Sequence, residues 1–293
     1  MKTILYATDY STNSISAIKL ADVFRNKLDA QLHIIHVFDI SATFISTVSL
    51  AYAKLEEAAF KDNREKLELF CREHLEKFDD DDTKPMLHVV ENSIESVGII
   101  EKAEEINADL IVVGMRGRNI VRDLFIGSTA TALIEKSPVP VLTVPQKPIP
   151  SGIKNIIYAT AFEEVDVLAI DKISEFAATF DAEIKLIHVS TKNEYAAEDQ
   201  MLWFKEMLKE KVSYKNISFE FRSSEDVFNT LKGFLLEVDV DILVMLEREG
   251  NSLIPNLWHF DLVKRMKLEH LVPLLSFQKN SLQLSKKVSS SIE

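Results

Sequence analysis

Four residues in the first half of the chain have the types and spacing of a phosphate-binding loop: Gly114, Gly117, Gly127 and Ser128. The apolar run Leu110–Val113 ends at Gly114, and the pattern that follows is G-x2-G-x9-G-S. A glycine directly after a strand lets the backbone approach a ligand because it carries no Cβ. A Gly-Ser-Thr step at the start of a helix presents main-chain N–H groups and the positive end of the helix dipole. This combination predicts a binding site for a di- or triphosphate.

The same three glycines also allow a structural interpretation, in which they end a strand, form a turn and begin a helix. We favour phosphate binding because three of the chain's 7 glycines fall in one short window with a strand–loop–helix context. Three arginines lie within or beside this loop: Arg116, Arg118 and Arg122. They either balance phosphate charge or are solvated loop charges.

Asp9 ends the apolar segment Thr3–Thr8, which has the pattern of a first strand. Its carboxylate either accepts hydrogen bonds from a ribose or a base, or caps the helix that follows. The matching position in a second copy of this segment is Ala161, whose side chain can do neither. We therefore favour ligand binding for Asp9.

Other reactive side chains form no catalytic or metal-binding pattern. His33 and His36 are three positions apart in a strand-like segment, so they point to opposite faces and cannot share a metal ion. Cys71, the single cysteine, lies on the apolar side of a charged helical segment, and we expect a buried, unreactive thiol. The sequence contains no Walker A, H-E-x-x-H, C-x-x-C or G-x-S-x-G motif. We expect no catalytic residues and no metal site.

The elements that would position these residues occur twice. TILYATDYS at 3–11 matches NIIYATAFE at 155–163, and DAQLHIIHV at 29–37 matches DAEIKLIHV at 181–189. Matching landmarks in the same order indicate two copies of one domain. The segment KPIPSG, with two prolines and a glycine, is the natural linker. The expected boundaries are 1–147 for the first domain, 153–279 for the second, and 280–293 for a loosely ordered polar tail.

Within each copy, short apolar runs alternate with helical patterns, which is typical of an α/β fold with a parallel sheet covered on both faces. We expect two tandem doubly wound domains of five strands each, with a flavodoxin-like strand order. The strands expected in the first copy are Thr3–Thr8, Leu32–Phe38, Met86–Val90, Leu110–Val113 and Val139–Val144. The helices expected there are Ser11–Leu28, Tyr52–Phe78, Ser93–Asn107 and Gly127–Lys136.

Charge and composition exclude several classes of partner. The 293 residues carry a net charge of −12 with a pI of about 5.2, which argues against nucleic-acid binding and against docking on anionic membranes. A single cysteine fits a reducing compartment. The sequence shows no signal-peptide pattern, and no apolar stretch approaches the ~20 residues of a membrane span. These features predict a cytoplasmic protein.

The second copy lacks the glycines of the first. Leu246 and Glu249 replace the first two glycines of the loop, and Glu247 adds another negative charge. Bulky and acidic side chains oppose phosphate binding through steric closure and repulsion. We therefore predict that the second domain binds no nucleotide. The aromatic segment Trp258–Phe260 suggests a filled pocket or a contact surface.

Together these motifs resemble the universal stress protein family, in a tandem form with two UspA-type domains in one chain. The resemblance rests on the glycine pattern, the first strand with Asp9, and the segments LHIIHV and SPVPVLTVP. It implies an α/β fold and a family in which a subset of members binds ATP. It also implies that Asp9 lies near the ribose and adenine and that the backbone of Val37 lies at the adenine. The expected nucleotide-binding residues are Ala7, Thr8, Asp9, Val37, Gly114, Met115, Arg116, Gly117, Gly127, Ser128 and Thr129.

Three functions remain open from this resemblance. The first is a stress-response regulatory module that binds one ATP, with or without Mg²⁺, in its first domain. The second is a scaffold that recruits partners without a ligand, and the third is a slow ATPase with Asp9 as the only candidate base. Family members commonly pair through the last strand, so we expect VPVLTV and LVPLLSF to form a pseudo-dimer within the chain. A homodimer or another protein partner stays open.

Overall fold

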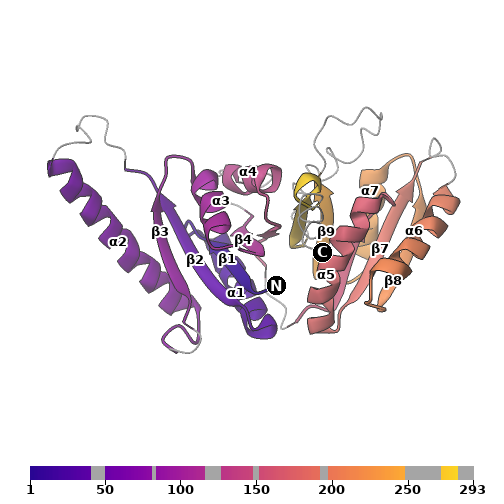
Figure 1. The fold of residues 1–293 in the computed structure, drawn as a ribbon, viewed down its shortest axis with the longest axis horizontal. Helices are drawn as coiled ribbons and strands as arrows, with labels where there is room; N and C mark the ends of the chain where they lie inside the picture. Colours follow the sequence, from indigo (N-terminus) through magenta and orange to yellow (C-terminus); the bar gives the residue numbers. More distant parts are fainter. Residues whose placement is uncertain are drawn as a thin grey trace, which may run out of the picture. The chain divides into compact units, whose positions relative to one another are not determined.

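A computed structural model describes residues 1–40, 50–80, 84–115, 127–147, 152–191, 197–247 and 272–282. The chain divides into two compact units: the first contains residues 1–121, 127–133 and 143–149, and the second contains 122–126, 134–142 and 150–293. Figure 1 shows the two units and the labels of their elements.

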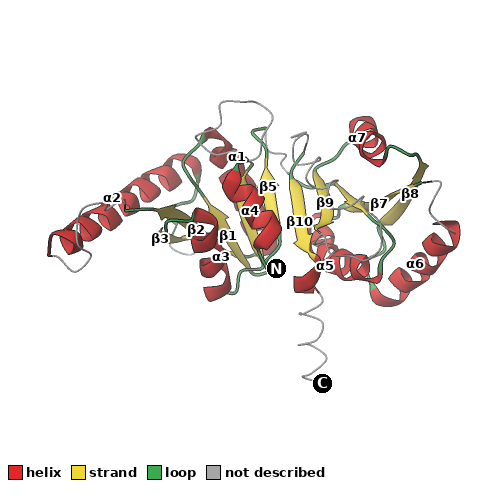
Figure 2. Cartoon of the chain, turned by 90° about the horizontal axis from the view of Figure 1, so that it is seen from above, coloured by secondary structure: helices red, strands yellow, loops and turns green. Residues whose placement is uncertain are grey.

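Strands and helices alternate through the first half of the chain. The elements are β1 (Thr3–Ala7), α1 (Thr12–Leu28), β2 (Gln31–Phe38), α2 (Leu50–His74), β3 (Met86–Glu91), α3 (Glu95–Glu105), β4 (Leu110–Gly114), α4 (Ser128–Lys136) and β5 (Val141–Val144). Their strand order is β3-β2-β1-β4-β5, and the pairs β2–β3, β1–β2 and β1–β4 are parallel. Figure 2 shows α1 and α2 on one face of these strands and α3 on the other. The predicted parallel, doubly wound arrangement is confirmed for these elements.

The strand order corrects the flavodoxin-like order that we expected. In that order β3 would lie beside β1, whereas here β3 pairs with β2 and β1 pairs with β4. The burial of the two strands agrees with the observed order. The residues of β2 from Leu32 to Ile35 are buried, so this strand suits a position with neighbours on both sides. In β3, Met86 is exposed and every residue after Leu87 is only half-buried, which suits an edge.

The second half repeats this topology. Its elements are β6 (Asn155–Ala159), α5 (Glu164–Phe180), β7 (Glu183–Ser190), α6 (Ala197–Lys211), β8 (Ile217–Ser223), α7 (Val227–Glu237), β9 (Ile242–Glu247) and β10 (Leu274–Gln278). The order β10-β9-β6-β7-β8 repeats that of the first half, with β10 in the place of β5. Each neighbouring pair among these five strands is parallel.

The repeat extends to single residues with unusual backbone conformations. Tyr10 and Phe162 have φ values of 63° and 58° at equivalent positions after the first strand of each half. Asp29 and Asp181 adopt left-handed conformations at the ends of α1 and α5. Because non-glycine residues rarely adopt positive φ, these matches show that both halves use the same turns. The helical turn after β10 buries Leu282, so the first residues of the expected tail pack against the protein, and 283–293 lie outside the described residues.

Candidate functional site

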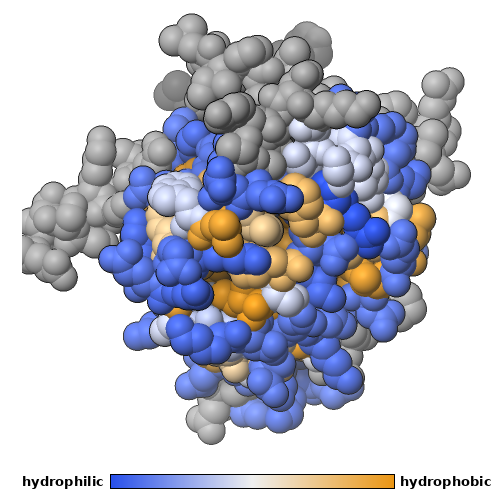
Figure 3. Space-filling view, turned by 90° about the vertical axis from the view of Figure 1, so that its right-hand side faces the viewer, coloured by the Kyte–Doolittle hydropathy of each residue, from blue (hydrophilic) through white to orange (hydrophobic). Residues whose placement is uncertain are grey.

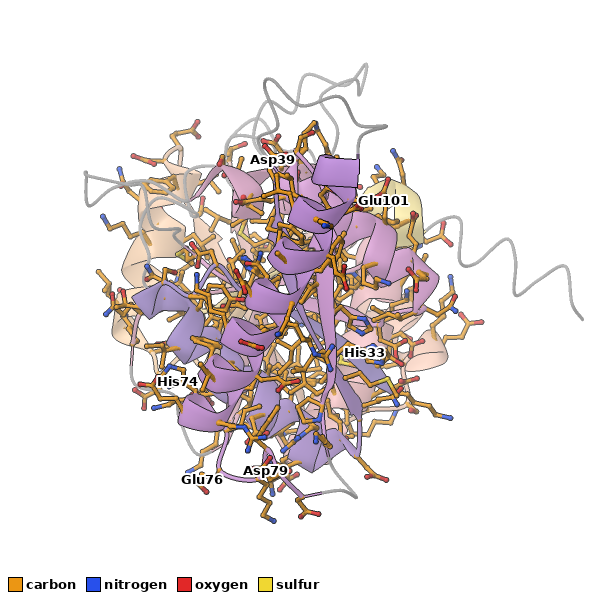
Figure 4. All side chains as sticks on the ribbon, turned by 90° about the vertical axis from the view of Figure 1, so that its left-hand side faces the viewer. His33, Asp39, His74, Glu76, Asp79 and Glu101 are labelled. Carbon is orange, nitrogen blue, oxygen red and sulfur yellow. The ribbon has the colours of Figure 1, made fainter. Side chains whose placement is uncertain are left out.

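The expected binding residues lie at one edge of the first sheet. Ala7, the last residue of β1, is in register with Ile35 of β2 and Val113 of β4. β1 and β4 therefore end at the same level, and β2 continues three residues further to Phe38. Asp39 directly follows β2 and marks this edge in Figure 4, whereas Glu76 and Asp79 lie at the opposite end. Ligands of open α/β sheets bind outside the carboxyl ends of strands, near the point where the strand order reverses. Here that point lies between β1 and β4.

Asp9 organises the turn between β1 and α1. Its Oδ1 accepts hydrogen bonds from the Ser11 N–H at 3.0 Å and from the Ser14 hydroxyl at 2.7 Å. The N-cap of α1 is Ser11 rather than Asp9. The carboxylate therefore does not cap the helix directly, and instead it is fixed by two donors from the first turn. This holds a negative charge at the end of β1 with a defined direction.

Gly114 has a structural role that we did not predict. A Cβ at this position would lie 3.0 Å from the carbonyl carbon of Asn13 and 3.1 Å from the nitrogen of Ser14. These are backbone atoms, which cannot rotate away as a flexible side chain can. The glycine therefore allows the first turn of α1 to pack directly on the end of β4, and this contact also positions the partner of Asp9.

The start of α4 is joined to the end of β4. The N–H of Gly127 donates to the carbonyl of Met115 at 3.0 Å, and the N–H of Met115 donates to the carbonyl of Val144 at 2.9 Å. The first helical hydrogen bond runs from Thr131 N–H to Gly127 O at 3.0 Å. Gly127 and Met115 are buried, whereas Ser128 is exposed. The positive end of α4 and a solvent-facing hydroxyl thus lie at the edge that carries Asp9.

A second set of contacts approaches α4 from the side of β2 and β3. The Asn92 N–H donates to the carbonyl of Phe38 at 2.9 Å, which joins the ends of the two strands. Asn92 Oδ1 then accepts from the N–H of Ile94, and this leads into α3. In the first turn of α3, Glu95 Oε2 accepts a hydrogen bond from the Thr129 hydroxyl at 2.5 Å. The starts of α3 and α4 are therefore held together.

These contacts connect the ends of β1, β2 and β4 with the starts of α1, α3 and α4 in one closed circuit. The Thr8 N–H completes it by donating to the carbonyl of Ile35 at 3.0 Å. Val37 is buried in β2, and its side chain packs closely against the backbone of Gly98 in α3. The structure thus gathers one set of the expected residues: Ala7, Thr8, Asp9, Val37, Gly114, Met115, Gly127, Ser128 and Thr129.

Some expected residues fall where no contact can be assigned. Arg116, Gly117, Arg118 and Arg122 lie outside the described residues, as do Glu249 and the segment Trp258–Phe260. Sequence reasoning also missed residues that take part in the circuit: Ser11, Ser14, Asn92 and Glu95. Two signals in the sequence could have found them. Ser11 and Ser14 follow Asp9 and are three positions apart, and Asn92 lies three positions before the acidic Glu95 at a helix start.

The remaining reactive residues lie away from this edge or serve structural roles. His33 shares a hydrogen bond of 2.9 Å with His88, whereas His36 donates to the carbonyl of Thr8 at 2.8 Å. The prediction that the two histidines of this strand face opposite sides is confirmed. Cys71 is buried, as predicted, and burial raises the pKa of its thiol to about 12.

The described part of the chain offers neither a cluster of metal ligands nor a membrane span. Among those residues, no group of three or more His, Cys, Asp or Glu side chains is arranged to hold a metal ion. No helix within the same ranges has the length and apolar character needed to cross a membrane.

The equivalent edge of the second unit is built differently. Asp166, in the first turn of α5, is 0% exposed. Its carboxylate accepts hydrogen bonds from four groups: the hydroxyls of Tyr158 at 2.8 Å and Thr160 at 3.0 Å, and the N–H groups of Ala161 at 3.0 Å and Glu163 at 3.1 Å. Leu246 and Glu247, at the end of β9, are also buried. The donors of this turn are thus used by the protein's own carboxylate.

Comparison with known proteins supports the family resemblance. The profile of the universal stress protein family matches residues 1–145. A Staphylococcus aureus (strain USA300) protein named as a putative member of this family is 31% identical over 168 residues, which cover 56% of this chain and 95% of that protein. Universal stress protein MJ0577 of Methanocaldococcus jannaschii is 26% identical over 164 residues, covering 50% of this chain and 96% of that protein.

Solved structures show that the fold extends across both halves. A universal stress protein from Archaeoglobus fulgidus superposes with a TM-score of 0.68 at 17% identity, covering 94% of this chain and 98% of that chain. One from Pseudomonas aeruginosa gives a TM-score of 0.61 at 13% identity, covering 99% and 98%. At these identities the likeness concerns the fold. The family profile and the identity over nearly the whole S. aureus protein show that this chain belongs to the universal stress protein family.

Proposed function

We propose that the first unit binds one adenine nucleotide, ATP, and that the chain acts as a nucleotide-dependent regulatory module of the stress response. The observation that carries this proposal is the bond from Gly127 N–H to the Met115 carbonyl, which places the start of α4 beside the end of β4. The first-turn N–H groups of a helix have no partner within the helix, and they attract anions. The chemistry of the site therefore suits phosphates.

The other groups at the edge suit the remainder of a nucleotide. Asp9 supplies a fixed carboxylate that can accept hydrogen bonds from ribose hydroxyls or from an adenine amino group. Val37 supplies backbone groups near the end of β2. Ser128 adds an exposed hydroxyl for a phosphate oxygen. No redox or group-transfer chemistry is required of these residues, because binding alone is proposed.

We assign one nucleotide to each chain, with residues 1–147 as the binding domain and 153–279 as a degenerate domain of the same family. The buried Asp166 carboxylate supports this assignment, since the donors of the second turn already have an anionic partner. Leu246 replaces the first glycine of the loop, and its buried side chain lies near the end of β9. The pairing of the two last strands as a pseudo-dimer stays a prediction.

Calorimetry of the full chain tests the proposal. We expect ATP in Mg²⁺ buffer to bind with a stoichiometry near one, and the supernatant of boiled purified protein to contain adenine nucleotide. Asp9→Ala should weaken ATP binding about tenfold or more, because a charged hydrogen-bond acceptor is lost. Asp80→Ala is the matched control, since Asp80 directly follows Asp79 in the turn at the opposite edge. A chain that carries no nucleotide and binds none with Mg²⁺ would refute the proposal.

A scaffold function is the second candidate, and it rests on exposed apolar residues of the second unit. Leu202 and Trp203, adjacent in α6, are 59% and 53% exposed, and Leu236 in α7 is 67% exposed. Figure 3 views the protein from the side of the second unit and shows apolar side chains among hydrophilic ones. Exposed apolar patches mark sites of protein interaction. If Asp9→Ala left cellular activity unchanged while Trp203→Ala abolished it, the scaffold function would be favoured.

A further inference from the structure

The carboxylate of Glu95 lies where a nucleotide phosphate would approach α4. Glu95 belongs to the first turn of α3, and its Oε2 accepts from the hydroxyl of Thr129, the second residue of α4. The first turn of α4 contains no acidic residue of its own. A negative charge near a helix N-terminus is stabilising. Glu95 therefore supplies this charge to α4 from a neighbouring helix.

The backbone position of Glu95 is fixed independently of α4. The start of α3 is anchored to the end of β2 through Asn92, which donates to the Phe38 carbonyl and accepts from the Ile94 N–H, both at 2.9 Å. Gly98, one turn further along α3, packs so closely on Val37 that a Cβ would lie 3.2 Å from its Cγ1. The helix cannot move away from β2 without breaking these contacts. The backbone of Glu95 thus stays close to α4, and its exposed carboxylate is held there by the Thr129 hydrogen bond.

In this arrangement a bound phosphate and the Glu95 carboxylate would repel each other. A phosphate bound at Ser128 and Thr129 would share the start of α4 with the Glu95 carboxylate. Like charges a few ångströms apart at a protein surface repel enough to lower affinity about tenfold or more. Mg²⁺ relieves such repulsion, because it is commonly bound by one or two carboxylates together with substrate phosphates. A monophosphate, with fewer charges to place near α4, would meet less repulsion.

We propose that Glu95 is a specificity-determining residue that makes ATP binding dependent on a divalent cation. It disfavours the metal-free triphosphate through repulsion and accepts the Mg²⁺ complex, in which the charge of the cation would offset that repulsion. The inference rests on the proposed nucleotide site in the first unit. The inference adds the carboxylate of Glu95 to the proposed site. This residue lies outside the glycine motif and belongs to α3 rather than α4.

Binding calorimetry on the full chain tests the role of Glu95. ATP is titrated into the wild type, Glu95→Gln and Glu104→Gln, once with excess Mg²⁺ and once with a chelator. Gln keeps the size of the side chain and can still accept the Thr129 hydrogen bond, so Glu95→Gln should fold normally. Glu104→Gln removes the same charge from an exposed position later on α3. Thermal unfolding of all three proteins confirms that they are folded.

The decisive quantity is the ratio of the ATP affinity in excess Mg²⁺ to the ATP affinity in chelator, measured for each protein. For the wild type and Glu104→Gln, chelation of Mg²⁺ should weaken ATP binding about tenfold or more, and Glu95→Gln should recover most of this loss in chelator. AMP affinity should change less than about twofold between the proteins, which shows that the base and ribose contacts are intact. An unchanged Mg²⁺ dependence in Glu95→Gln overturns the inference and leaves the nucleotide site standing. Failure of all three proteins to bind ATP or AMP in either buffer overturns both proposals.

Discussion

Asp9 accepts a hydrogen bond from the Ser14 hydroxyl at 2.7 Å, and in the second unit the carboxylate stands at the other of these two positions. Asp166 stands on the helix where Ser14 stands in the first unit, and Ala161 stands at the strand end where Asp9 does. Each turn thus keeps one carboxylate. In the first it comes from the loop and is half-buried, and in the second it comes from the helix and is fully buried.

Asp166→Ala is expected to destabilise the second unit strongly. The change leaves four buried or half-buried donors without their acceptor, including the hydroxyl of Tyr158 and the N–H of Ala161. We expect the free energy of unfolding to fall by about 3 kcal/mol or more. Urea denaturation followed by far-UV circular dichroism measures this change.

Two further variants make the Asp166 prediction specific. Asp171→Ala removes an exposed carboxylate from the same helix, and it should change the free energy of unfolding by less than about 0.5 kcal/mol. The double variant Ala161→Asp/Asp166→Ser reproduces the arrangement of the first unit and should recover part of the lost stability. Equal losses for Asp166→Ala and Asp171→Ala would contradict the structural role of the buried carboxylate.

Gly114→Ala is expected to impair the site through α1 rather than through a direct clash with a ligand. The new Cβ would lie 3.0 to 3.1 Å from backbone atoms of Asn13 and Ser14, so the first turn of α1 must move. Because Ser14 holds Asp9, we expect weaker nucleotide binding together with a loss of about 1–3 kcal/mol in stability. Gly152→Ala is the control, since a Cβ there meets no atom within 4 Å. If the Gly114→Ala variant were as stable as the Gly152→Ala variant, the close contact with α1 would not require a glycine.

The stability of the first unit should fall as the solution becomes more acidic than pH 6.5. Burial and the neighbouring His33 lower the pKa of His88 to about 4, and burial also lowers the pKa of His33. Lys102 opposes protonation of both rings, while Glu105 favours it for His88. Between pH 6.5 and 4 the unfolded chain therefore binds protons that the folded chain does not. The stability that the neutral histidines contribute above pH 6.5 is lost as the pH falls through this range.

Urea denaturation at successive pH values measures this loss. One proton taken up only by the unfolded chain corresponds to a slope of at most about 1.4 kcal/mol per pH unit, and the half-buried state of His88 reduces it. His88→Gln should flatten the slope between pH 6.5 and 4 without changing it above about pH 7. If the variant kept the full slope, the His33–His88 pair would not be its source.

Cys71 should resist thiol reagents in the folded protein. The thiolate is the reactive form, and burial raises the pKa of this thiol to about 12 while also blocking access. At about pH 8 we expect the native chain to react with an aromatic disulfide reagent at least about 100-fold more slowly than the urea-unfolded chain. Similar rates in both states would mean that α2 opens readily from the sheet.

Sequence alone predicted most elements of the fold because they depend on local periodicity. The run ending at Gly114 predicted β4, and the charged segment with Leu67 and Cys71 predicted α2 to within a few residues at each end. The paired segments after residues 3 and 155 predicted a duplicated topology, since a repeat is visible without any knowledge of contacts. The glycine pattern and Asp9 likewise pointed to one edge of the first sheet.

Tertiary structure alone decided which strands are neighbours and which side chains meet. The alternation of strands and helices is the same for several strand orders, and only the folded structure shows that β3 lies at the edge beside β2. Glu95 and Thr129 are far apart in sequence, and only the packing of α3 beside α4 brings them together. Gly114 and Asn13 likewise meet only because α1 packs on the end of β4. The periodicity of a segment indicates which of its residues face the core and which face solvent. Contacts between segments depend on how the helices cover the sheet, which no single segment encodes.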